Sequence, residues 1–102
     1  WNIDRSIWAL QGRHRDMEVL AGYVYSVPNK TPYYLPVYEN GKWSYGPCVN
    51  RVLDRKRFEE WKTRFYEFEG WDPSSGRPRR KTLESMGLKK VADLLESRGK
   101  LG

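Results

Sequence analysis

The sequence predicts a small, mainly α-helical domain that carries one short β-hairpin, at about residues 37–45. Two segments place apolar side chains at helical spacing, one between Ile3 and Ala21 and the other between Phe58 and Phe68. Between them lies a segment rich in proline and tyrosine, which contains an Asn-Gly dipeptide. With 102 residues, 38% of them hydrophobic and 15% aromatic, the chain is long enough for one domain with a modest core, and we expect residues 1–102 to form a single domain.

We expect the first helix to run from Ile3 to about Ala21. Its apolar side chains lie within a narrow arc of a helical wheel: Ile3, Ile7, Leu10, Met17 and Ala21. Trp1 and Trp8 fall on nearly the opposite side, so this helix has two faces to bury. A small domain covers one such face, and we therefore expect the face with the two tryptophans to pack against another part of a longer protein.

The segment between Gly22 and Asn50 loses the helical period and contains four prolines, which exclude a helix there. Within it, residues 37–39 and 42–45 flank Asn40-Gly41, the dipeptide that best tolerates the two positive φ values of a type I′ turn. A lone hairpin is marginal in water, so we expect its aromatic side chains to lean on helices.

The strongest helical pattern follows. Asp54 can cap the helix, and Phe58, Trp61, Phe65 and Phe68 share one arc. Gly70 suits the left-handed position that ends a helix.

Two shorter helices are predicted after this. Thr82 caps the first, which Gly87 ends. The second runs from about Lys89 to Arg98, with Gly99 at its end; its inward side chains are Val91, Leu94 and Leu95.

Charge and composition narrow the function classes. The net charge is +6, and residues 51–102 hold fourteen Lys and Arg against nine Asp and Glu, which raises nucleic acid or an acidic protein as a partner. The single cysteine, Cys48, can form no internal disulfide and no thiolate metal site. No apolar run is long enough for a membrane span and no leader pattern opens the chain, so we expect a cytoplasmic location. Because the first residue is Trp1 rather than Met, we also expect a piece of a longer protein.

Arg13-His14-Arg15-Asp16 contains the His-Arg-Asp sequence of the protein-kinase catalytic loop, but Ala21 stands where that loop needs asparagine and no glycine-rich loop precedes it. The kinase interpretation is therefore rejected. A histidine packed along a helix is the simpler role of His14. The functional interpretation is that Arg13, His14 and Arg15 face a substrate channel completed by other domains, with Trp1 and Trp8 at an interface.

A nucleic-acid interpretation would use the basic run at residues 77–81 on phosphates, with Tyr38, Trp43 and Tyr45 as stacking platforms. This combination is unspecific, and we do not favour it. The adjacent carboxylates at Glu59-Glu60 point apart on a helix, so they do not form a pair for acid–base catalysis. We predict no catalytic, cofactor-binding or metal-binding residue in this chain.

The residues Phe65-Tyr66-Glu67-Phe68-Glu69-Gly70-Trp71-Asp72-Pro73, followed by Gly76-Arg77-Pro78, Leu83 and Met86-Gly87-Leu88, form a recognisable series. The series resembles the closing segment of the aldehyde:ferredoxin oxidoreductase family of tungsten-pterin enzymes. The similarity is best from about Val52 to Gly102 and departs at Arg79, where many members carry threonine. The first half is less typical, which fits a subfamily with a different substrate, including the benzoyl-CoA reductase-type branch.

The resemblance implies a cytoplasmic, oxygen-sensitive parent enzyme with a tungsten or molybdenum bis-pterin and a [4Fe-4S] cluster. Such an enzyme oxidises aldehydes or reduces an acyl substrate, and exchanges electrons with ferredoxin or a partner subunit. This chain would end its last helical domain, in contact with the remaining domains. Cys48 matches no cluster motif of the family and inherits no ligand role, so we expect the isolated chain to bind neither metal nor pterin. The sequence does not decide whether the chain also contributes to a homo-oligomer interface of the enzyme.

The competing class is a stand-alone basic module that binds nucleic acid or an acidic protein. The discriminating feature is that Trp1 and Trp8 have no obvious partner face within the chain, which a free-standing module should avoid.

Overall fold

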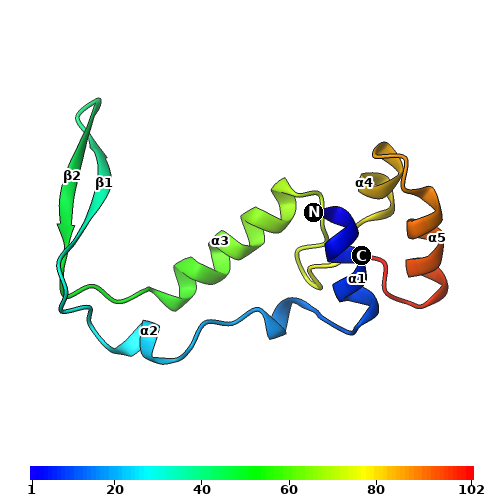
Figure 1. Cartoon of the computed structure of the whole chain (residues 1–102), viewed down its shortest axis with the longest axis horizontal. Coiled ribbons are helices and arrows are strands. Elements are labelled where there is room, and N and C mark those ends of the chain that lie inside the picture. Colours follow the sequence, from blue (N-terminus) through cyan, green and yellow to red (C-terminus); the bar gives the residue numbers. More distant parts are fainter. The chain divides into compact units, whose positions relative to one another are not determined.

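The computed structural model describes all 102 residues, which divide into two compact units. Unit 1 combines Trp1–Val19 with Glu59–Gly102, and unit 2 is Leu20–Phe58. The elements are α1 (Asn2–Leu10), the 3-10 turn η1 (Arg15–Met17), α2 (Tyr23–Ser26), β1 (Tyr33–Glu39), β2 (Lys42–Cys48), α3 (Arg55–Phe68), α4 (Arg80–Ser85) and α5 (Lys89–Ser97) (Figure 1). The predicted class, mainly α with one hairpin, is confirmed.

The aliphatic core of unit 1 lies where α1 and α4 pack on α5 (Figure 1). Its fully buried members are Ala9, Leu83, Ala92 and Leu95, with Leu88, Val91 and Leu101 packed around them. Burying one leucine side chain away from water contributes about 2 kcal/mol to the stability of the fold. Gly87 and Gly99 end α4 and α5 with positive φ, as predicted. The prediction for Leu94 is wrong, because Ala92 takes the inward position and Leu94 is exposed.

The predicted long first helix is also wrong, since α1 ends at Leu10. Gly12 has a φ of 95°, a left-handed conformation that stops the helix, and the chain continues as a loop into η1. The exclusion of helix after Gly22 fails at α2, one turn that ends before the first proline of that segment. Thr82 caps no helix either; its hydroxyl donates to the Gly70 carbonyl at 2.6 Å.

The buried face of α1 is the opposite of the predicted one. The side chains turned inward are Asn2, Arg5, Ser6 and Ala9, whereas Ile3, Ile7 and Leu10 are 53%, 47% and 37% exposed. Hydrogen bonds made by the polar side chains explain why this face is buried. The Asn2 Oδ1 accepts a 2.7 Å hydrogen bond from Trp71 Nε1, and the Ser6 hydroxyl donates to the Asn2 carbonyl at 2.7 Å.

Helix α3 has the predicted ends. The Asp54 carboxylate accepts from the Arg57 amide at 2.7 Å, and Gly70 follows the helix with a φ of 71°. Its buried side chains are Lys62 and Tyr66 rather than members of the aromatic arc, of which Phe68 is 86% exposed.

The hairpin is longer than predicted, with seven residue pairs from Tyr33 and Cys48 at its base to Glu39 and Lys42 at the turn. Asn40 and Gly41 have φ values of 51° and 75°, which confirms the type I′ turn. The expected support from helices is wrong, because the hairpin's aromatic side chains are between 58% and 76% exposed.

Candidate functional site

A charged network occupies the interior of unit 1. Arg5, on α1, is 4% exposed, and its Nε donates to the Gly76 carbonyl at 2.6 Å. Its Nη1 donates to one carboxylate oxygen of Glu18, while the Tyr66 hydroxyl donates to the other. Glu18 therefore links the end of η1 to both α1 and α3.

Two aromatic rings enclose the Arg5 guanidinium. Its central carbon lies 4.4 Å from the centre of the Trp71 ring and 5.2 Å from that of Tyr66, which gives cation–π attraction. Gly76 permits this arrangement. It has a φ of 70°, and a Cβ there would lie 2.4 Å from Arg5 Nη2 and 3.2 Å from the Tyr66 ring.

The network fixes the protonation of its members. Burial, followed by the hydrogen bond to Glu18, raises the pKa of Tyr66 to about 12. Burial alone would also raise the pKa of Glu18, but the hydrogen bonds from Tyr66 and Arg5 and the charges of Arg5 and Arg13 lower it overall. The phenol thus stays protonated and the carboxylate ionised across the physiological range, so the network suits a fixed anchor rather than a proton-transfer pair.

Arg15 ties three segments together. Its two terminal nitrogens donate to the Thr63 hydroxyl, the Pro73 carbonyl and both the carbonyl and carboxylate of Glu59, at 2.8–2.9 Å. Lys62 lies beside it and donates to the Glu18 carbonyl at 3.1 Å and to the Glu59 carboxylate at 3.0 Å. Hydrogen bonds from Arg15 and then Lys62 lower the pKa of Glu59.

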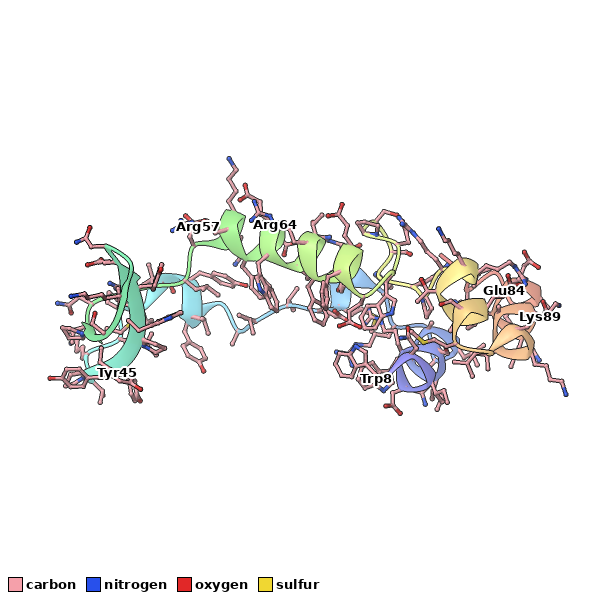
Figure 2. All side chains as sticks on the ribbon, turned by 90° about the horizontal axis from the view of Figure 1, so that it is seen from above. Trp8, Tyr45, Arg57, Arg64, Glu84 and Lys89 are labelled. Atoms are coloured by element: carbon pink, nitrogen blue, oxygen red, sulfur yellow. The ribbon has the colours of Figure 1, made fainter.

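The other predicted site residues lie around this network, with one exception. Arg13 stacks 4.7 Å above the Trp8 ring and its Nε lies 3.3 Å from Glu18 (Trp8 is labelled in Figure 2). Trp1 stacks on Trp71 with ring centres 6.0 Å apart. His14 stands apart, where its Nδ1 accepts from the Asp16 amide at 3.3 Å. The premise that Trp1 and Trp8 lack partners within the chain is therefore wrong, although Trp1 remains largely exposed.

Two arginines of the basic run at residues 77–81, Arg77 and Arg80, donate hydrogen bonds to other groups of the chain. Arg80 donates to three carboxylates, those of Glu84, Asp93 and Glu96, at 2.7–2.9 Å. The hydrogen bonds to Asp93 and then Glu84, together with the charges of Glu96 and Asp93, raise the pKa of Arg80. Arg77 donates to the Gly99 carbonyl at 2.9 Å. The arginines are thus positioned by acidic and carbonyl oxygens of the chain itself, which weakens the nucleic-acid interpretation.

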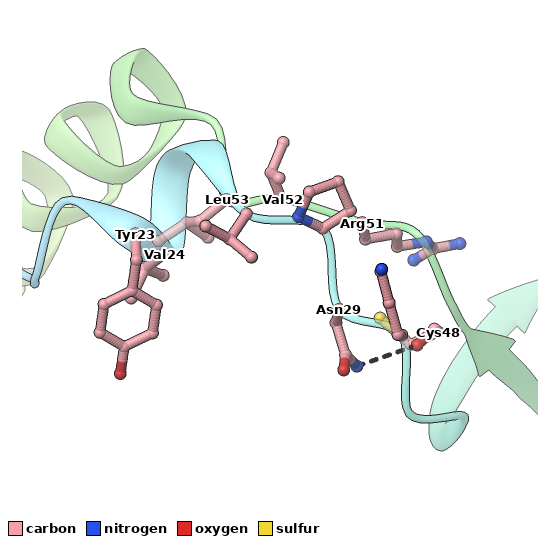
Figure 3. A pocket seen from close by; sticks show the side chains of 10 residues that line it. Tyr23, Val24, Asn29, Cys48, Arg51, Val52 and Leu53 are labelled. Atoms are coloured by element: carbon pink, nitrogen blue, oxygen red, sulfur yellow. Dashed lines mark hydrogen bonds between the residues drawn. The ribbon is translucent and has the colours of Figure 1, made fainter.

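Unit 2 contains an open pocket of about 630 Å³ (Figure 3). Its apolar wall comes from Tyr23, Val24, Val27, Pro28, Val52 and Leu53, and its polar groups from Asn29, Lys30, Cys48 and Arg51. Asn29 fastens the base of the hairpin, since its side-chain amide donates to the Cys48 carbonyl at 3.3 Å (Figure 3). Lys30 and Arg51 are exposed, so the pocket has no buried charge aimed into it.

Sequence reasoning missed Arg5, Glu18, Tyr66 and Trp71 as a set. Apolar periodicity assigns charged residues to solvent, and no motif marks Arg5 as buried or Glu18 as its partner. One signal was present: glycines at positions 70 and 76 bracket Trp71, which indicates a tight turn around a large ring.

No helix of the chain is both long and apolar enough to cross a lipid bilayer. Residues 1–88 match the family model for aldehyde ferredoxin oxidoreductase, domains 2 & 3. No curated protein and no solved structure matches the chain. The family match includes the first half of the chain, where the sequence resembled the family least.

Proposed function

Because the chain belongs to the aldehyde ferredoxin oxidoreductase family, we propose that it is a structural and interface part of the C-terminal helical region of a tungsten- or molybdenum-pterin, iron–sulfur oxidoreductase. In this proposal the parent enzyme is cytoplasmic and acts on aldehydes or acyl substrates, with ferredoxin or a partner subunit as the electron carrier. The benzoyl-CoA reductase-type branch is the subfamily we propose for an acyl substrate.

One observation carries the interface role: an exposed aliphatic face on unit 1. It consists of Ile3, Ile7, Leu10, Met86 and Leu94. The Asn2 side-chain amide lies 3.4 Å from the Met86 sulfur, which places Met86 beside the start of α1. Leu10 and Leu94, together with Arg98 and Lys100, line one hollow of about 490 Å³. Exposed aliphatic side chains favour a protein cover over water, and the remaining domains of the parent enzyme are the cover we propose.

The donor groups of this chain do not fit the family's cofactors. A [4Fe-4S] cluster takes four cysteine thiolates, and the chain has one cysteine. No three side chains of the His, Cys, Asp and Glu types gather where they could hold a metal ion. We therefore place the pterin and the cluster in other parts of the parent enzyme and assign no catalytic residue here.

We also propose that Arg13, His14 and Arg15 belong to a substrate channel, but with different roles. Arg15 donates four hydrogen bonds within unit 1, so it would position the loop, whereas Arg13 and His14 have side chains 43% exposed and could reach a ligand. Trp1 and Trp8 would lie at the interface with the next domain.

Elemental analysis of the full-length protein, purified from its anaerobically grown source, tests the assignment. We expect about one tungsten or molybdenum and about four irons per chain, and neither metal in the isolated 102-residue chain. A full-length protein without these metals would overturn the oxidoreductase assignment. Stoichiometric metal in the isolated chain would overturn the placement of the cofactors elsewhere.

A further inference from the structure

The two faces of the β-hairpin differ in chemistry. Because side chains alternate along a strand, the observed register gathers Tyr34, Pro36, Tyr38, Trp43, Tyr45 and Pro47 on one face. We call this set the aromatic face. The other face carries Glu39 and Lys42 beside the turn, with Tyr33 at the base.

The aromatic face is continuous and uncharged. Its cross-strand pairs are Tyr34 with Pro47, Pro36 with Tyr45, and Tyr38 with Trp43, so every pair joins a ring to a ring or to a proline. The Tyr38 and Trp43 ring centres lie 5.1 Å apart. All six residues are exposed, and Tyr45, at 76%, points away from the ribbon (Figure 2).

We propose that the aromatic face is a docking surface for a separate protein whose apolar contact patch is bordered by carboxylates. This goes beyond the proposed function and rests on it only in that the chain works as part of a larger enzyme.

The residue types indicate a reversible contact. The aromatic face contains tyrosine, tryptophan and proline but no aliphatic side chain, whereas the aliphatic face of unit 1 contains only Ile, Leu and Met. Tyrosine and tryptophan keep a polar group hydrated while the ring is free, and they are enriched among the residues that contribute most to binding at interfaces. Permanent interfaces are more hydrophobic. The aliphatic face thus suits other domains of the same enzyme, and the aromatic face suits a partner that leaves.

The net charge of unit 2 indicates an acidic partner. Leu20–Phe58 holds six Lys and Arg against two Asp and Glu, a net charge of +4 that accounts for most of the chain's +6. Such a field attracts acidic surfaces and repels a second copy of the same unit. Single-stranded nucleic acid needs cations along its stacking rings to follow the phosphates, and the aromatic face has none, with Lys42 on the opposite face.

Site-specific crosslinking in the full-length enzyme tests the proposal. A photoreactive benzoylphenylalanine replaces Tyr45 in the source cells, and a matched variant carries it at Tyr33, on the opposite face of the same hairpin. We expect Tyr45 alone to crosslink to a separate polypeptide, with the attached peptide acidic when identified by mass spectrometry. Crosslinks to the enzyme's own chain, to a second copy, to nucleic acid, or equally from both positions would overturn the proposal.

The partner identified in this way is then purified and its affinity for the full-length enzyme measured. The Tyr34→Ala/Tyr45→Ala variant leaves the Tyr38–Trp43 pair in place, so the hairpin keeps its own cross-strand contact. We expect this variant to bind at least about tenfold more weakly, Tyr33→Ala to bind normally, and the wild-type affinity to fall with added salt. Equal losses in both variants, or no loss, would contradict the proposal. The metal content of the same preparations reports separately on the proposed function.

Discussion

Arg5 joins segments of unit 1 that aliphatic packing alone would leave apart. It reaches Gly76, Glu18 and the rings of Tyr66 and Trp71 from a single position on α1. Because a buried guanidinium that loses its carboxylate is strongly destabilising, these contacts depend on one another. The interior of unit 1 therefore combines apolar packing with polar contacts of defined geometry.

The closeness of Arg5 to Gly76 gives a first prediction. The Gly76→Ala substitution should lower the free energy of unfolding by about 2–4 kcal/mol, because it adds a clash to the cost of a positive φ and Arg5 is held on several sides. Gly87→Ala is the matched control. Its φ of 74° is equivalent, but no atom lies within 4 Å of the added Cβ, so it should cost only about 1 kcal/mol. Urea denaturation of both variants measures the difference, and equal losses would contradict the clash.

Asp72 gives a second prediction, on pH. Partial burial would raise its pKa, but hydrogen bonds from Ser74 and Ser75 lower it to about 2, from an ordinary value of 3.8. Because the folded pKa is the lower one, the stabilisation is fully present above about pH 4 and is lost as the pH falls toward 2.

The Asp72→Asn variant should therefore be less stable by about 1–2 kcal/mol at pH 7 and nearly equal to the wild type at pH 2. Urea denaturation as a function of pH measures this. Asp16→Asn, at an exposed carboxylate, is the control and should change little at either pH. A difference between Asp72→Asn and wild type that is the same at both pH values would contradict the assigned hydrogen bonds.

At the scale of elements, the ends of α3, α4 and α5 and the hairpin turn were predictable, whereas the end of α1 near Gly12 and the buried faces were not. Gly70, Gly87, Gly99 and Asn40-Gly41 each need a backbone conformation that few residues adopt, so the sequence states them directly. Which face of α1 is buried depends on the residues that lie opposite it and can bond to its side chains. Asn2 and Arg5 turn inward because Trp71, Gly76 and Glu18 are there to receive them, and those contacts span up to 71 residues of sequence. No local pattern contains that information.

The hairpin gives a prediction at this scale. Its turn needs positive φ at both Asn40 and Gly41, so Gly41→Val should weaken the pairing of β1 and β2 by about 1–2 kcal/mol. Hydrogen exchange by mass spectrometry should show faster exchange in residues 33–48 and unchanged exchange in α4 and α5. Gly22→Ala, where φ is −56° and no atom crowds the added Cβ, should leave the hairpin unchanged. Unchanged exchange in Gly41→Val would argue against a hairpin specified by its turn.

At the scale of the whole molecule, the chain presents two apolar surfaces with different chemistry. The family membership was predictable from the residues between Phe65 and Leu88, because punctuation residues at fixed spacing carry it. The aliphatic face was not, since the helical period of α1 assigned Ile3, Ile7 and Leu10 to the core of the chain itself. We propose that these residues help to form a core between domains. Such a core explains both their helical spacing and their exposure in this chain.

Carbene footprinting under anaerobic conditions, on the isolated chain and on the full-length enzyme, tests this claim most directly. We expect Ile3, Ile7, Leu10, Met86 and Leu94 to be labelled in the isolated chain and protected in the enzyme, with Tyr45 labelled in both when no partner is present. Equal labelling of the aliphatic face in the two samples would show that no other domain covers it, and would contradict the role of this chain as an interface part of the oxidoreductase.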